Sequence, residues 1–276
     1  MKKHCRNLWK SMGFVLIFSL ALGIVPKTVL AQEPTNLIIE VDYMKVKPGQ
    51  EGTYVTLEQN VWKPIHQERI RKGVIVGWIL YQVMYAGADD PYNFVTINVY
   101  TNPSNLENPY AGIDFEKIHP GKNITKETEN TYNSRTLTRR QLMGRAVYAN
   151  PGGGESPGPH KYLVANFMKT IPGGNYMSIE NEIAKPVSQE LINNGVWAGW
   201  SVWTNVFPRG TGMESDVVTA DYYADLLKTG SVNYMQAFEK VHPQKNWSEF
   251  SEKMQKSRNI IRSELWKLID SAYAGQ

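Results

Sequence analysis

The chain contains one sequence pattern twice. A shift of 122 residues aligns residues 54–81 with residues 176–203 and gives 11 identities in 28 positions without a gap. Downstream, a shift of 123 aligns residues 115–120 with residues 238–243, and five of the six residues are identical. Self-similarity at one long period indicates a structural unit duplicated in tandem. We therefore expect the chain to fold as two related units.

The segment between the copies differs from both of them in composition. Residues 150–160 are dominated by glycine and proline, which is typical of a linker. The expected organisation is a first repeat over residues 32–149, a linker over residues 150–160 and a second repeat over residues 161–276.

Residues 1–31 have the pattern of a signal peptide. Four basic residues precede an uncharged apolar run from Gly13 to Val25, and small residues then offer a cleavage site before Gln32. The run is shorter than the roughly 20 residues that a membrane-spanning helix needs. We expect cleavage, with no stable membrane span afterwards, and a soluble periplasmic or secreted protein.

Removal of this leader changes the charge and the cysteine content. Residues 1–31 hold five of the 30 basic residues, none of the 26 acidic residues and the only cysteine, Cys5. The remaining 25 basic and 26 acidic residues form no basic stripe, so a nucleic-acid partner is not expected. Without cysteine or closely spaced histidines, neither a disulfide nor a metal site is expected, and no motif indicates a cofactor.

Each copy has the pattern of a β-α-β-β-α-β unit. Apolar residues at Tyr54, Leu57, Val61 and Ile65 form one helical stripe, and Gly73 is expected to end that helix. Segments rich in β-branched and aromatic residues predict the strands. The expected strands are residues 37–46, 74–85, 92–100 and 139–148 in the first copy and residues near 161–169, 196–206, 216–224 and 262–269 in the second.

This order is that of the ferredoxin-like unit, which leaves one face of its sheet uncovered. With its segment Tyr43 to Gly49, Trp62-Lys63-Pro64 and Gly77-Trp78, the sequence resembles the dimeric α/β-barrel superfamily, in a form with both halves on one chain. The resemblance implies an α+β fold in which two tandem units pack sheet to sheet as an intramolecular barrel. The superfamily includes antibiotic-biosynthesis monooxygenases and haem-handling enzymes, and its ligands lie between a sheet and its helices. No catalytic motif matches, so no catalytic residue is carried over.

An acid and an amide have exchanged strands between the copies. Asp42 and Asn98 lie on neighbouring strands of the first copy, and the aligned residues of the second copy are Asn166 and Asp221. A contact between the two residues would explain the exchange, because each copy keeps one carboxylate and one amide. We therefore predict that Asp42 lies beside Asn98, and Asn166 beside Asp221.

These pairs have two interpretations. In the first, they form the polar floor of a ligand pocket, with Asp42 or Asp221 as a general base, Arg139 and Arg262 as counter-charges, and Trp78 and Trp200 as aromatic walls. In the second, which is the more frequent situation, they form a buried network that is purely structural, and the tryptophans belong to the core.

Two further motifs recur in both copies. Pro64 and Pro186 lie inside the first helix of each copy and are expected to bend it. His119 and His242 each precede a proline. A histidine can act as a base or a metal ligand, but the residue before proline disfavours helix, so we expect both histidines to end helices.

Three functions remain open from the sequence. The first is the binding of a small, partly apolar molecule between a sheet and its helices. The second is a cofactor-independent oxygenase or isomerase that uses Asp42 or Asp221 as its base. The third is a structural or interaction module with a filled barrel. An unfilled space between sheet and helices would favour the first two over the third.

Overall fold

The structure, a computed structural model, describes residues 37–153 and 160–275. The expected signal peptide and most of the expected linker lie outside the described residues. The elements of the first repeat are β1 (Ile38–Val46), α1 (Glu51–Leu57), η1 (Glu58–Trp62), α2 (Lys63–Arg71), β2 (Gly77–Val83), β3 (Phe94–Tyr100), η2 (Pro103–Leu106), α3 (Phe115–Ile118), α4 (Ile124–Ser134) and β4 (Arg135–Ala149).

The second repeat has the same order of elements. After the short η3 (Pro151–Gly153), they are β5 (Tyr162–Thr170), α5 (Tyr176–Ile179), η4 (Glu180–Ala184), α6 (Lys185–Asn193), β6 (Gly199–Phe207), β7 (Val217–Tyr223), η5 (Leu226–Gly230), α7 (Tyr234–Val241), α8 (Trp247–Ser257) and β8 (Arg258–Tyr273). The predicted β-α-β-β-α-β order is therefore present in both copies.

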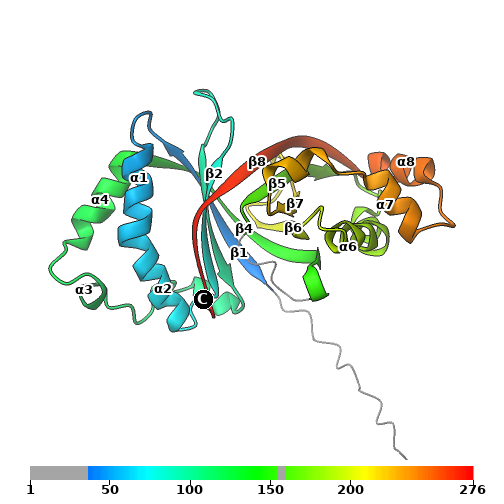
Figure 1. The fold of residues 1–276 in the computed structure, drawn as a ribbon. Coiled ribbons are helices and arrows are strands. Elements are labelled where there is room, and N and C mark those ends of the chain that lie inside the picture. Colours follow the sequence, from blue (N-terminus) through cyan, green and yellow to red (C-terminus); the bar gives the residue numbers. More distant parts are fainter. Residues whose placement is uncertain (1–36, 154–159, 276) are drawn as a thin grey trace, which may run out of the picture. The chain divides into compact units, whose positions relative to one another are not determined.

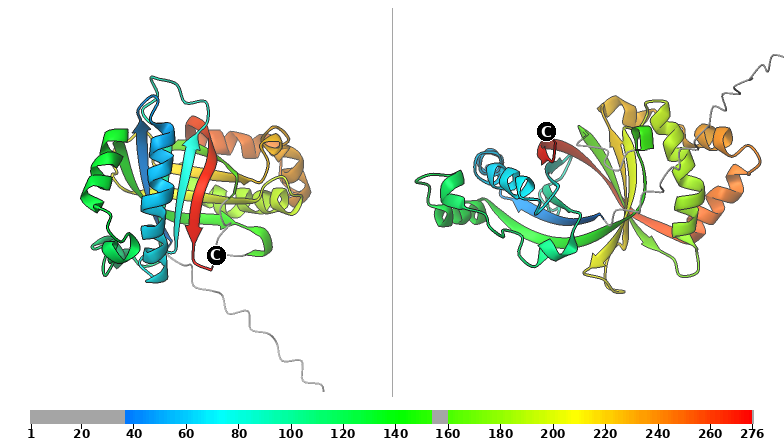
Figure 2. Two further views of the ribbon diagram at one scale, coloured as in Figure 1. Left: turned by 60° about the vertical axis from the view of Figure 1, so that its left-hand side comes forward. Right: turned by 90° about the horizontal axis from the view of Figure 1, so that it is seen from below.

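The eight strands form one closed antiparallel barrel in the order β1-β3-β2-β8-β5-β7-β6-β4. The two sheets face each other and are also joined along both edges, where β2 pairs with β8 and β4 pairs with β6. Helices of the first repeat lie on one side of the barrel and helices of the second repeat on the other (Figure 1; two further views in Figure 2). Closure leaves no free sheet edge among the described strands.

The last strand of each repeat is longer than the sequence indicated. β4 begins at Arg135 and pairs first with β1 and then with β6 of the other repeat. β8 begins at Arg258 and pairs first with β5 and then with β2. Each of these strands therefore crosses from its own sheet to the other and closes the barrel. The expected starts near Arg139 and Arg262 were wrong, because the first half of each strand is exposed and polar and lacks the alternation of apolar and polar residues that predicts a strand.

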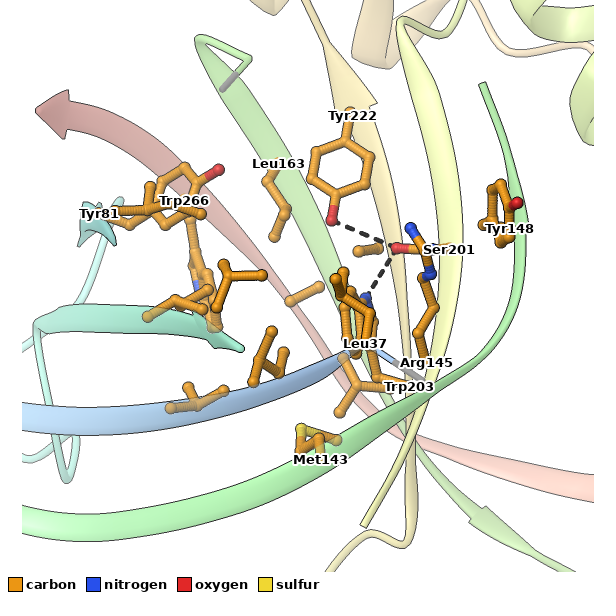
Figure 3. Close-up of a pocket in the computed structure, with 18 of the residues that line it drawn as sticks. Leu37, Tyr81, Met143, Arg145, Tyr148, Leu163, Ser201, Trp203, Tyr222 and Trp266 are labelled. Carbon is orange, nitrogen blue, oxygen red and sulfur yellow. Dashed lines mark hydrogen bonds between the residues drawn. The ribbon is translucent and has the colours of Figure 1, made fainter. Parts of the chain in front are cut away.

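The interior of the barrel is almost filled with side chains. Alternate residues of the strands, including Val41, Val95, Phe167 and Trp266, point inward and form one core. Only about 80 Å³ remains empty there. Near one end, Ser201 accepts a hydrogen bond of 2.7 Å from the Trp203 indole and lies 3.2 Å from the Tyr222 hydroxyl (Figure 3). This packing is that of a core rather than of a ligand site.

The first long helix of each repeat contains a π-helical segment. The segments η1 and η4 each come directly before the Lys-Pro pair that begins α2 or α6. Proline has no N–H to donate to the preceding turn, and the wider π turn accommodates its ring, so the helix continues past Pro64 and Pro186. Gly73, with φ of +70°, follows the end of the first helix as predicted.

In the part of the chain that the structure describes, no helix combines the length and apolar character that a membrane span requires.

Candidate functional site

Two cavities lie at equivalent positions, one in each repeat, between the sheet and its helices. The first-repeat cavity has a volume of about 350 Å³ and the second-repeat cavity a volume of about 550 Å³. Both fall in the range of about 300–1,000 Å³ that is usual for small-molecule sites. Trp78 lines the first cavity and Trp200 lines the second. The barrel is filled, but the space over its outer faces is not.

The floor of the second-repeat cavity contains the predicted amide–acid contact. Asn166 Nδ2 donates a hydrogen bond of 3.0 Å to Asp221 Oδ2 across β5 and β7. The other side of Asn166 is also held, because Ser263 Oγ donates to its Oδ1 at 2.6 Å. These contacts fix the orientation of the Asn166 amide, so its Nδ2 must face Asp221.

The two carboxyl groups of this cavity have strongly shifted pKa values. Burial raises the pKa of Asp221 to about 7, and the neighbouring charge of Glu180 adds to the increase, while the hydrogen bond from Asn166 opposes it. Burial likewise raises the pKa of Glu180 to about 7, with Tyr176 and Arg258 opposing. Because the two carboxyl groups interact, they titrate as a pair. With Arg258 nearby, the cavity is close to neutral at pH 7 when one of the two carries a proton.

Aromatic side chains form the rest of the second-repeat cavity. Trp197 and Trp200 come from the second strand and the loop before it, and Tyr234, Trp247 and Phe250 come from the helices that cover the sheet. Tyr234 and Phe250 stack with 6.4 Å between ring centroids, which fixes their planes. Trp203, by contrast, points into the barrel, so the two tryptophans of β6 lie on opposite faces of the sheet. The cavity offers flat apolar walls above a polar floor.

The first-repeat cavity also has aromatic walls, but more charged side chains line it than line the second. Asp42 and Asn98 both line it from adjacent strands, but the predicted contact between them is wrong. Asp42 binds Arg140 through both carboxylate oxygens, at 2.5 and 2.7 Å. Asn98 Oδ1 accepts from Arg69 at 2.9 Å. Asp42 lies opposite Thr96 and Asn166 lies opposite Thr219, so the register is the same in both copies. The difference is that each residue of the first pair is engaged by an arginine that the second copy lacks.

The counter-charges predicted for these pairs also lie elsewhere. Arg139 and Arg262 lie at one end of the barrel, where both form ion pairs with Glu214. Arg139 stands opposite Tyr43 on the neighbouring strand, and its guanidinium lies 4.9 Å from the centre of that ring. The next residue, Arg140, occupies the face that carries Asp42. Side chains of a strand alternate between its two faces. An error of one residue in assigning β4 to these faces therefore gave Arg139 the place that Arg140 occupies.

Arg69 and His66 were missed by the sequence analysis. Both lie in α2, and both are buried, with 1% and 6% of their surface exposed. The sequence signal that distinguishes them is the difference between the copies. The residues aligned with His66 and Arg69 are Ser188 and Leu191, so a polar helix face in one repeat is less polar in the other.

His119 and His242 end helices, as predicted, and each also holds a π-helical segment. His119 is the residue after α3, and its Nε2 donates to the Val61 carbonyl at 2.9 Å. His242 makes the equivalent bond to the Ile183 carbonyl at 3.1 Å. A carbonyl can only accept, so Nε2 carries the proton in both rings. Each histidine thereby supports the segment that places Glu58 or Glu180 at its cavity.

Among its described residues, the second-repeat cavity lacks the histidine and cysteine ligands that most often hold a haem iron. Haem iron in proteins is held by histidine, cysteine, methionine or tyrosine. The second-repeat cavity has no histidine or cysteine among its described residues, and its Met168 sulfur accepts a hydrogen bond from Tyr176 at 3.3 Å. Over residues 37–153 and 160–275, no three His, Cys, Asp or Glu side chains cluster as metal ligands would.

Comparison of the structure with solved proteins identifies several with the same architecture. A candidate monooxygenase from Lactobacillus acidophilus is 9% identical, with a TM-score of 0.53 over 86% of this chain and 96% of that chain. A candidate monooxygenase from Fusobacterium nucleatum is 9% identical, with a TM-score of 0.53 over 87% of this chain and 96% of that chain. A candidate chlorite dismutase is 12% identical, with a TM-score of 0.51 over 86% and 96% of the two chains.

At these identities the likeness concerns the fold alone. No protein-family model matches the chain. No curated protein matches it either. The order of strands, the two ferredoxin-like units and these structural neighbours agree, and the chain therefore has the fold of the dimeric α+β barrel superfamily, with both units on one polypeptide.

Proposed function

We propose that the second-repeat cavity binds a small, partly apolar molecule that carries a hydrogen-bonding group. The observation that carries this proposal is the pairing of Asn166 with Asp221 at the floor of an aromatic cavity of about 550 Å³. Binding sites of this kind combine apolar walls with a few fixed polar groups, which orient the ligand.

The chemistry of the floor favours a ligand that is neutral overall. Near pH 7, one of the coupled carboxyl groups Asp221 and Glu180 holds a proton and the other faces Arg258. A hydroxyl or carbonyl group on a flat ring can exchange hydrogen bonds with this pair without a net charge. Trp200 and Trp247 supply the surfaces on which such a ring can stack.

The first experiment is a search for a co-purified ligand by native mass spectrometry of the protein made in its own host. The expected result is a bound small molecule whose occupancy falls in a Trp200→Ala variant. Trp62→Ala, which alters the first-repeat cavity, is the matched control and should retain it. Equal occupancy in both variants would contradict binding in the second-repeat cavity.

A second candidate function is a cofactor-independent oxygenase or isomerase. The observation that favours it is the pKa of Asp221, raised to about 7, because a general base is most effective when its pKa is near the working pH. Two structural neighbours are themselves described as candidate monooxygenases, which supports an oxygenase in general terms without indicating a substrate. In this reading Asp221 removes a proton from a carbon next to a carbonyl group.

The probe for this activity is 2-tetralone, a flat ketone with acidic C–H bonds. Exchange of these hydrogens for deuterium, followed by NMR, should be accelerated by the protein with an apparent pKa near 7. Asp221→Asn should abolish the acceleration while 2-tetralone still binds. If the unaltered protein binds 2-tetralone but does not accelerate the exchange, the result would support the binding function and contradict the enzymatic one.

We also propose that the protein acts outside the cytoplasm. The support is the basic and apolar pattern of residues 1–31. Edman sequencing of the protein recovered from the periplasm or medium should begin at Gln32. Recovery of the mature protein only from the cytoplasm, starting at Met1, would contradict export.

A further inference from the structure

Arg69 is a buried cation whose partners are all uncharged. Its guanidinium donates to the Pro109 carbonyl at 2.8 Å, to Asn98 Oδ1 at 2.9 Å and to the Tyr100 hydroxyl at 2.9 Å. Among the described residues, no carboxylate forms an ion pair with it. A buried charge is costly unless an opposite charge lies close to it. This arrangement therefore leaves the first-repeat cavity with a positive charge that its own residues do not directly neutralise.

Arg69 also fixes the protonation of His66. The distance from Arg69 Nη1 to His66 Nδ1 is 2.8 Å, and arginine can only donate, so Nδ1 is the acceptor. Burial and the charge of Arg69 lower the pKa of His66, and the ring is neutral. Its one proton is therefore on Nε2. The ring stacks on Trp78 at 5.1 Å, which holds it in place at the cavity wall.

The other charges of the cavity do not remove the positive excess. Glu40 and Asp42 share one arginine, Arg140, at 3.5 and 2.5 Å. Burial raises the pKa of Glu58 to about 7, so this group is only partly ionised at neutral pH. The three arginines of the cavity therefore exceed its ionised carboxylates only by the protonated fraction of Glu58, but no carboxylate forms an ion pair with Arg69 itself.

The second repeat serves as an internal comparison. Its residues aligned with His66, Arg69 and Arg140 are Ser188, Leu191 and Ser263. The barrel, the helices and the π segments are the same in both copies, so the fold does not require these cations. Their presence in one cavity alone indicates a ligand chemistry specific to that cavity.

We propose that the first-repeat cavity is a separate binding site for a small organic carboxylate with an apolar body. The His66 Nε2–H donates to the carboxylate, and the positive field of Arg69 favours its negative charge. Trp62, Trp78 and Tyr110 line the same cavity and contact the apolar body. The site is distinct from the second-repeat cavity, and its occupant complements the charge that the protein leaves unbalanced.

The probe is benzoate, with benzamide as its neutral isostere, titrated into the full exported chain by calorimetry. Benzoate should bind once per chain, and benzamide at least tenfold more weakly. Arg69→Leu, which imports the residue of the second repeat, should weaken benzoate binding at least tenfold. Arg71→Leu removes an exposed arginine two residues away and should leave the affinity unchanged.

Arg69→Leu also removes four hydrogen bonds, so a readout on the unaltered protein is needed. With ¹⁵N-labelled histidine, benzoate should shift the NMR signal of the His66 Nε2–H and leave that of His242 in place. Equal affinity for benzoate and benzamide, equal loss in the two arginine variants, or an unmoved His66 signal would overturn the proposal. A benzoate site that saturating 2-naphthol displaces would show that the ligand occupies the second-repeat cavity instead, and would also overturn it.

Discussion

Asn166 donates a 3.0 Å hydrogen bond to Asp221 across two adjacent strands, whereas Asp42 and Asn98, at the aligned positions of the first repeat, each bind an arginine instead. The same two residue types therefore serve different partners in the two copies. In the second repeat they bind each other at the floor of an aromatic cavity. In the first they position Arg140 and Arg69 at a charged cavity.

The first prediction concerns the second-repeat pair. Asn166→Ala leaves Asp221 without its amide donor in a partly buried position, and should lower the free energy of unfolding by roughly 1–3 kcal/mol. The exchanged double variant, Asn166→Asp with Asp221→Asn, should keep most of the stability that Asn166→Ala loses. An aspartate at position 166 can still accept a hydrogen bond from Ser263 and can accept another from an asparagine at position 221. The measurement is a double-mutant cycle on urea unfolding. Additive losses, with no recovery in the exchanged variant, would argue against the pairing.

The second prediction concerns the pH dependence of stability. The pKa of Asp221 is about 7 in the folded protein, against an ordinary value of 3.8. Between these values the folded state holds a proton that the unfolded state has lost, so the free energy of unfolding falls as the pH rises from about 4 to about 7. Asp221→Asn removes this contribution. Between pH 5 and pH 8, the free energy of unfolding of the variant should therefore fall by roughly 1–2 kcal/mol less than that of the unaltered protein.

Urea unfolding at the two pH values measures this difference. Glu58 titrates in the same range in both proteins and cancels in the comparison, whereas Glu180 is coupled to Asp221, so the difference between the two proteins reports on the Asp221–Glu180 pair. A parallel pH dependence in the variant and the unaltered protein would mean that Asp221 is ionised normally.

The fold was more predictable than the site, for a physical reason. Duplication, the order of elements and the packing of the two open sheets follow from hydrophobic period and from the need to cover apolar faces. The full lengths of β4 and β8 did not follow, because their solvent-facing halves carry arginine, threonine and asparagine rather than a clear alternation. Those halves pair with β1 and β5 of their own sheets, whereas closure of the barrel depends on the second halves, which pair with β6 and β2.

The site depended on details of a single residue. Arg140 was missed because assigning the wrong phase to β4 gave its role to Arg139. Arg69 was missed because a charged residue on a helix is usually solvated, and only the tertiary structure buries this one against Asn98 and Tyr100. The exchange between the copies predicted the Asn166–Asp221 contact correctly and the Asp42–Asn98 contact wrongly, because the sequence pattern did not show that two arginines engage the first pair.

The third prediction concerns Asp42 and Arg140. The Asp42 side chain is 8% exposed and that of Arg140 is 55% exposed, so loss of the arginine leaves a buried carboxylate. Arg140→Ser should lower the free energy of unfolding by roughly 1–3 kcal/mol. Adding Asp42→Asn should restore most of it, because the pair then copies the Asn166–Ser263 hydrogen bond. Thermal unfolding of the three variants tests this, and a double variant less stable than Arg140→Ser would contradict it.

The fourth prediction concerns the histidine that supports the π segment. His119→Ala removes the donor to the Val61 carbonyl and should lower the free energy of unfolding by roughly 1–3 kcal/mol. His119→Gln keeps an N–H donor on a side chain of comparable length and should lose less. Urea unfolding compares the two. If the glutamine variant is as unstable as the alanine variant, the ring contributes by packing and not through this bond.

The last prediction concerns the proposed binding of a flat, partly apolar molecule above Asp221 in the second-repeat cavity. The most direct measurement is a titration of the unaltered protein and of Trp200→Ala and Asp221→Ala with 2-naphthol, a neutral aromatic alcohol, followed by tryptophan fluorescence. We expect saturable quenching in the unaltered protein, affinity reduced at least tenfold in each of these two variants, and unchanged affinity in Arg69→Leu. Unchanged affinity in Trp200→Ala and Asp221→Ala, or the absence of saturable binding by the unaltered protein, would contradict it.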